Sequence, residues 1–151
     1  MKRIMVATDG SQSAEEAVEA GLELASEHEA SVVLVHVVPA VDVAPWAPFS
    51  MAAGAPHVVS TEDRAPLDDA VDAAEARGIP VTGELLAGVA IDEIVEAADS
   101  HDVDLIVMGS RGHGAVARAL LGSVSLGVLR KTHRPVLIVR ASRVPAGSTA
   151  G

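Results

Sequence analysis

The segment that decides the fold is Asp104-Leu-Ile-Val-Met-Gly-Ser-Arg-Gly-His-Gly-Ala-Val-Ala-Arg-Ala-Leu-Leu-Gly-Ser-Val-Ser125. Its apolar run, Leu105 to Met108, is typical of a buried strand, and the run breaks at Gly109. Nine residues separate Gly112 from the pair Gly122-Ser123, where we expect a helix to begin. Glycines at a strand end and a glycine–serine pair at a helix start expose backbone N–H groups, which can bind an anion. The segment therefore predicts a split anion site.

The charge distribution favours the same region. All 21 acidic residues lie in residues 1–104, whereas residues 105–151 hold seven bases and no acid. A positive segment around a glycine-rich loop favours a polyanionic ligand, although solvated helix charges explain it equally well. The net charge of −10 and the near absence of aromatic residues argue against general nucleic-acid binding.

Length and composition predict a cytoplasmic protein with one domain over residues 1–141 and a flexible Ser/Gly/Pro-rich tail over 142–151. No apolar run is long enough to cross a bilayer, and the first residues do not form a signal peptide. The chain has no cysteine, so it has no disulfide, thiol nucleophile or thiolate metal site. Its six histidines are scattered without the spacing of metal ligands.

Strand-like and helical patterns alternate along the chain. Ser13, with Glu16 three residues later, predicts a capping box at the start of the first helix. Pro66 suits the first turn of a later helix, which Gly78 ends. The expected strands are 2–8, 31–38, 79–86, 103–108 and 135–140, and the expected helices begin near 13, 66, 90 and 123.

This alternation, with nearly continuous apolar strands, predicts an α/β fold in which helices cover both faces of a parallel sheet. The strand at 79–86 contains Pro80 and Gly83, which a sheet tolerates best at its edge. His36 lies in an apolar strand, so we interpret it as a hydrogen-bonded core residue. In such sheets ligands bind beyond the carboxyl ends of the strands, where the winding direction reverses.

Residues 40–60 carry three prolines and a glycine, and they predict an irregular loop. Trp46 and Phe49, the only aromatic residues, lie in this loop. They either cover a ligand or partner surface or fold back as a local plug, which is the favoured interpretation.

The glycine pattern matches neither of the two commonest phosphate motifs. It lacks the lysine of a P-loop, and its spacing differs from that of the dinucleotide fingerprint. On physical grounds Gly109 and Gly112 permit a tight turn, while the start of a helix at Gly122-Ser123 meets phosphate groups. A glycine-rich turn followed by a serine-capped helix without any ligand remains the alternative.

The spacing Gly109-x2-Gly112-x9-Gly122-Ser123 resembles the nucleotide motif of the universal stress protein family, in its ATP-binding branch. The opening segment 2–11, the segment His36-Val37-Val38 and the last strand, 134–140, resemble the family as well. The Pro-rich region 40–66 departs from its pattern, so ligand contacts there are not carried over.

The resemblance implies a three-layer α/β sandwich of the adenine nucleotide alpha hydrolase-like class, with a five-stranded parallel sheet of order 3-2-1-4-5. It also implies an adenine-nucleotide site between strands 1 and 4, in which ATP carries Mg²⁺ or Mn²⁺ on its phosphates. Ala7, Thr8 and Asp9 would flank the nucleoside, and Asp9 would bind the ribose hydroxyls; a helix cap is the other role open to Asp9. Val37 and Met108 would line the adenine slot.

The remaining residues that the resemblance assigns to the site surround the phosphates. They are Gly109, Gly112, Gly122, Ser123, Val124 and Ser125. Arg111 either reaches the phosphates or faces solvent. His113 either approaches a phosphate or faces solvent, and the second is the favoured interpretation.

The resemblance further implies a homodimer that pairs through the last strand, Val136 to Val139. It favours an ATP-binding stress or signalling module with little turnover. The alternative is a slow ATPase or autophosphorylating enzyme that uses Ser123 or Ser125 as the acceptor. We identify no catalytic base beside a water site, so no catalytic residue is assigned.

Overall fold

The computed structural model describes residues 1–39, 61–111 and 121–141. Within these ranges strands and helices alternate along the chain. The elements are β1 (Arg3–Ala7), α1 (Gln12–His28), β2 (Ser31–Val38), α3 (Thr61–Ala76), β3 (Val81–Ala87), α4 (Ala90–Ser100), β4 (Leu105–Gly109), α5 (Ser123–Lys131) and β5 (Val136–Val139).

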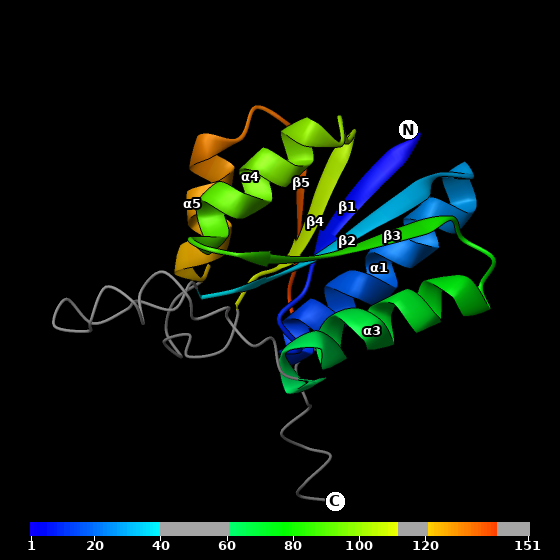
Figure 1. Ribbon diagram of the computed structural model, residues 1–151. Coiled ribbons are helices and arrows are strands. Elements are labelled where there is room, and N and C mark those ends of the chain that lie inside the picture. Colours follow the sequence, from blue (N-terminus) through cyan, green and yellow to red (C-terminus); the bar gives the residue numbers. More distant parts are fainter. Residues whose placement is uncertain (40–60, 112–120, 142–151) are drawn as a thin grey trace, which may run out of the picture.

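The five strands form one parallel sheet in the order β3-β2-β1-β4-β5. Helices α1 and α3 cover one face of the sheet, and α4 and α5 cover the other (Figure 1). The predicted three-layer sandwich and its strand order are therefore confirmed.

Each face of the sheet has its own apolar core, because side chains alternate along a strand. Ile4 and Val6 of β1 pack under α1 and α3, whereas Met5 packs under α4 and α5. All three side chains are fully buried. Because these strands are covered on both faces, their sequences are nearly continuous runs of apolar residues rich in Val, Ile and Leu.

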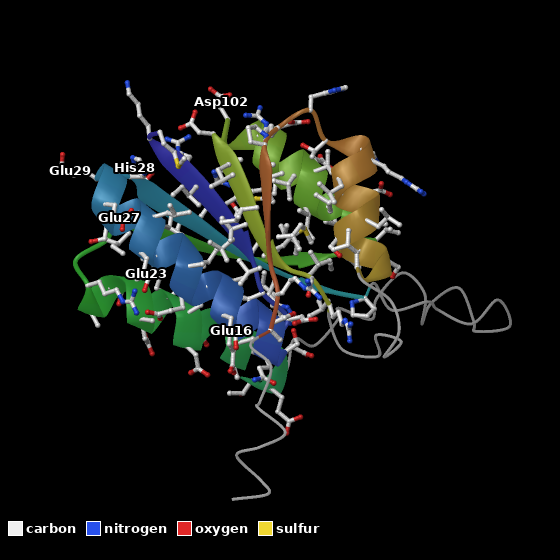
Figure 2. All side chains as sticks on the ribbon, turned by 180° about the vertical axis from the view of Figure 1, so that it is seen from behind. Glu16, Glu23, Glu27, His28, Glu29 and Asp102 are labelled. Carbon is white, nitrogen blue, oxygen red and sulfur yellow. The ribbon has the colours of Figure 1, made fainter. Side chains whose placement is uncertain are left out.

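The outer surface of α1 is acidic. Figure 2 shows Glu16, Glu23 and Glu27 spaced along this helix. Its opposite side buries small and aliphatic residues, including Ala17, Gly21 and Leu22. Gly21 is needed for close packing, because a Cβ there would lie 2.5 Å from Val6 Cγ2.

Two helix starts differ from the predictions. Ser11, not Ser13, is the N-cap of α1, and its side chain accepts a hydrogen bond from the Ala14 N–H. Pro66 lies inside α3, which already begins at Thr61, so its assignment to the first turn was wrong. Pro66 has no N–H, and the Glu62 carbonyl therefore has no helical donor at that position.

The edges of the sheet agree with the sequence. β3 is an edge strand, and Pro80 immediately precedes it. Gly78 ends the helical segment before it in the left-handed conformation that favours glycine, with φ of +69°. No helix in the described part of the chain combines the length and the apolar character needed to span a membrane. The predictions for the loop 40–60, with Trp46 and Phe49, and for the tail 142–151 lie outside the described residues.

Candidate functional site

A cavity of about 480 Å³ opens at the carboxyl ends of β1 and β4. These strands are neighbours from which the chain winds in opposite directions, toward β2 on one side and β5 on the other. Ten of the twelve predicted site residues line this cavity. They are Ala7, Thr8, Asp9, Val37, Met108, Gly109, Arg111, Gly122, Ser123 and Val124.

The other two predicted residues are placed differently. Gly112, like His113, lies outside the described residues. Ser125 lies beneath the cavity wall, 2% exposed, and its hydroxyl donates to the carbonyls of Ser110 and Gly122 over 3.1 and 3.0 Å. Its hydroxyl proton is therefore engaged within the protein.

One side of the cavity is apolar. Val37 and Met108 face the α4 and α5 layer, where Ile94 of α4 completes the wall. The Met108 side chain is almost fully buried in this core. A slot between aliphatic side chains suits a flat apolar ring system.

The end of β1 forms a tight polar turn. The Asp9 carboxylate accepts a hydrogen bond from the Ser11 N–H at 2.9 Å, and Thr8 Oγ1 accepts one from the Gly10 N–H at 3.4 Å. Gly10 has φ of +80°, a conformation that glycine adopts without strain. Asp9 therefore supports the turn before α1 and borders the cavity, whereas Ser11 caps the helix.

His36 borders the cavity, which the core interpretation missed. Its Nδ1 lies 2.7 Å from the Thr8 carbonyl, and a carbonyl can only accept, so Nδ1 carries the proton. The residue is hydrogen-bonded as predicted, but it is only half-buried. Its position near the carboxyl end of a parallel strand was the available signal. Sequence reasoning also missed Ala14, Val35, Pro39, Ala90 and Ile94, which other elements bring to the same wall.

The start of α5 forms the opposite side of the cavity. Gly122 is the N-cap in an extended conformation, without a side-chain hydrogen bond, and the first turn contains no acidic residue. Ser123 is exposed, and both Ser123 and Val124 border the cavity. The first N–H groups of a helix have no carbonyl partner within it and carry a partial positive charge. This wall can therefore bind an anion.

The segment Gly109–Arg111 is held from three sides. The Ser110 N–H donates to the Val139 carbonyl of β5 at 2.8 Å, and the Ser110 carbonyl accepts from the Gly122 N–H at 2.6 Å. Gly109 packs so closely on α1 that a Cβ would lie 2.4 Å from Ser13 Oγ. Arg111 is half-buried and borders the cavity. This position supports the prediction that Arg111 reaches the phosphates rather than facing solvent.

A second hollow of about 480 Å³ adjoins the cavity and shares Asp9, His36, Val37 and Pro39 with it. Its walls from α1 and α3 are acidic, and they include Glu15, Glu62 and Asp69. Among the described residues that line the second hollow are neither Arg111 nor the start of α5, both of which line the first cavity. An anionic group is therefore favoured at the α5 end.

Among the described residues no group of three or more histidine, aspartate or glutamate side chains is arranged to hold a metal ion. The described residues include no cysteine.

Known proteins resemble the chain over nearly its whole length. The model of the universal stress protein family matches residues 1–140. Universal stress protein MJ0531 of Methanocaldococcus jannaschii is 37% identical over 143 residues, which cover 92% of this chain and 82% of that protein. The curated protein MJ0577 of the same organism is 28% identical over 153 residues.

Solved structures agree with this match. The structure of MJ0577 superposes with a TM-score of 0.80 at 28% identity, covering 93% of this chain and 96% of that one. A universal stress protein in complex with cAMP gives a TM-score of 0.69 at 30% identity, with 93% and 98% coverage. The Archaeoglobus fulgidus protein in complex with dAMP gives 0.66 at 26% identity, with 92% and 98% coverage.

Proposed function

The chain belongs to the universal stress protein family, and we propose that it binds ATP in the cavity at the ends of β1 and β4. The observation that carries this proposal is the chemistry of the two opposed walls. Val37 and Met108 offer an aliphatic slot, and the start of α5 borders the same cavity together with Arg111. The first N–H groups of a helix have no carbonyl partner within that helix. Two structural neighbours were solved with adenine nucleotides, cAMP and dAMP, which supports an adenine ligand.

The proposed orientation follows from charge. Adenine lies in the aliphatic slot, and the Asp9 carboxylate accepts from the ribose hydroxyls. The phosphates extend toward Gly122, Ser123 and Arg111, away from the acidic hollow. Ser125 contributes by holding the Ser110 and Gly122 carbonyls, since its hydroxyl donates to both. Mg²⁺ or Mn²⁺ would neutralise the phosphates, bound chiefly to the phosphate oxygens, and the exposed Ser123 hydroxyl could supply a protein oxygen.

Nucleotide occupancy would act as a stress or signalling switch with little turnover. A slow ATPase or autokinase is the second candidate, and the placement of the serines favours Ser123 over Ser125 as its acceptor, because only Ser123 is exposed. Phosphate release from Mg-ATP at micromolar protein separates the two. Release of several phosphates per site each minute would contradict a binding module with little turnover and would support a slow ATPase.

We further propose a homodimer through β5. This strand forms an edge of the sheet, and Leu137 on it is 38% exposed. A sheet edge presents unpaired backbone groups, which a second copy of the strand can satisfy.

The direct test is to denature the purified protein and identify any released nucleotide by chromatography. Isothermal titration with Mg-ATP should then give a Kd in the micromolar range, about −8 kcal/mol.

Gly122→Val should abolish binding, because a branched side chain at the N-cap obstructs the α5 end of the cavity. The control is Thr82→Val, at an exposed position on the edge strand β3 and outside the residues that line the cavity. Unchanged ATP affinity in Gly122→Val would contradict the proposed site.

A further inference from the structure

We infer that Ser13 is a positioning residue, which fixes Arg111 so that its guanidinium meets the nucleotide phosphates. This inference rests on the proposed function. It assigns to α1, a helix that the phosphate motif does not include, a part in selecting phosphorylated ligands.

The hydroxyl of Ser13 holds both backbone polar groups of Arg111. The Arg111 N–H donates to Ser13 Oγ at 3.3 Å, and the Ser13 hydroxyl donates to the Arg111 carbonyl. A serine hydroxyl has one proton and two acceptor lone pairs, so it can make both bonds at once. Ser11 Oγ adds a weaker bond to the same carbonyl at 3.4 Å.

The contact is protected from water and closely packed. Ser13 is only 4% exposed in the first turn of α1. It approaches β4 where Gly109 stands, and a Cβ on Gly109 would lie 2.4 Å from Ser13 Oγ and 2.7 Å from the Ser13 carbonyl carbon. The glycine that opens the phosphate motif therefore makes room for Ser13, and it does so without a positive φ.

The consequence concerns the Arg111 side chain. Arg111 borders the cavity, while its backbone is anchored on α1. Ser110, one residue earlier, is anchored on β5 and α5 instead. Fixing both peptide groups limits the directions that a long arginine side chain can take, so less conformational freedom is lost when it binds a phosphate.

The same turn connects the two ends of the proposed ligand. The Asp9 carboxylate accepts from the Ser11 N–H, and Ser11 and Ser13 hold Arg111. Among the described residues, the hydrogen-bond partner of the Ser13 hydroxyl is Arg111, which we assign to the phosphate end. Loss of that hydroxyl should therefore weaken binding of ATP and spare binding of adenosine.

The test compares ATP with adenosine on the full chain. ATP affinity is measured by calorimetry and adenosine affinity by ligand-observed NMR, for wild type, Ser13→Ala and Ser26→Ala. Ser26 is an exposed serine on the same helix and serves as the control. We expect Ser13→Ala to weaken ATP binding about tenfold, the scale of one lost hydrogen-bonded group, with adenosine changed less than about twofold. If Ser13→Ala folds poorly, Ser13→Cys replaces it in the test. Cysteine is similar in size but is a weak hydrogen-bond donor, so it should also weaken ATP binding and spare adenosine binding.

A double-mutant cycle with Arg111→Ala tests whether Ser13 acts through Arg111. In the Arg111→Ala background, Ser13→Ala should change ATP affinity less than about twofold. Full additivity of the two effects, an equal loss for ATP and adenosine, or no loss for ATP would overturn the inference while the proposed function stands. Wild-type protein that binds neither ligand would instead refute the proposed function, and the inference with it.

Discussion

The Gly122 N–H donates a 2.6 Å hydrogen bond to the Ser110 carbonyl, which brings the end of β4 and the start of α5 together. Ser125, one turn into the helix, donates its hydroxyl to the same carbonyl. The two ends of the glycine-rich segment are therefore fixed to each other, independently of any ligand. This closure gives Gly122 and Ser125 a structural role, and it separates Ser123, which faces the cavity, from Ser125, which supports the cavity wall.

Ser123 and Ser125 should respond differently to replacement by alanine. Ser123→Ala should weaken ATP binding about three- to tenfold through one lost hydrogen bond, with stability changed by less than about 0.5 kcal/mol. Ser125→Ala should instead lower the free energy of unfolding by about 1 kcal/mol, because it removes the buried hydroxyl whose proton the Ser110 and Gly122 carbonyls share. Urea unfolding and ATP titration of both variants check this. The reverse pattern, with stability lost in Ser123→Ala alone, would show that the assignment of roles is wrong.

Gly109→Ala should destabilise the protein by overpacking. The added Cβ would meet Ser13 Oγ at 2.4 Å and the Ala14 N at 2.9 Å, and backbone atoms of a helix cannot move aside cheaply. We expect a loss of about 1–3 kcal/mol in urea unfolding and weaker ATP binding.

Gly78→Ala is the comparison for that variant. A Cβ there meets nothing within 4 Å, and the cost of about 1–2 kcal/mol comes only from its φ of +69°. It should leave ATP binding unchanged. A Gly109→Ala protein that binds ATP like wild type would refute the role given to the close contact with α1.

Asp104 should make stability depend on pH. Its carboxylate accepts from the backbone N–H groups of Lys2 and Arg3 at 2.6 and 3.0 Å, and these bonds hold its pKa below the ordinary 3.8. A lowered pKa means that the stabilisation is complete above the ordinary value and is lost as the pH falls through the lowered one.

Asp104→Asn should therefore lower the urea midpoint near neutral pH, and the difference from wild type should shrink as the pH falls toward about 3. Asp72→Asn, at an exposed position on α3, provides the control and should show no such trend. A difference that stays constant across this range would contradict the ionised carboxylate as its source.

Leu137→Lys should convert the proposed dimer to a monomer. A lysine on an edge strand opposes pairing with a second strand, because its charge would be buried in the interface. Light scattering after size-exclusion chromatography measures the change. Leu126→Lys, on α5 and equally exposed, should remain dimeric. Dimers that survive Leu137→Lys but dissociate in Leu126→Lys would move the interface from β5 to α5.

The sequence by itself determined the elements and the class of the fold. The apolar pattern placed the strand Ser31–Val38 with the bounds that the structure has, and it placed the start of the helix Ala90–Ser100 near residue 90. Pro80 and Gly83 placed β3 at the sheet edge. These features depend on neighbours within a few residues, so a local pattern reports them. The strand order came from the family resemblance, because periodicity does not say which strands pair.

Tertiary structure decided what individual side chains do. Ser13 and Ser11 have similar surroundings in the sequence, yet Ser11 caps α1 and Ser13 binds Arg111, 98 residues away. Gly109 indicated a turn, but its lack of a Cβ is required by the close approach of α1. His36 looked like a core residue until the Thr8 carbonyl fixed its ring at the cavity. The role of each of these residues depends on which element, distant in the sequence, lies next to it at the carboxyl edge of the sheet. Packing of the whole chain decides which element that is.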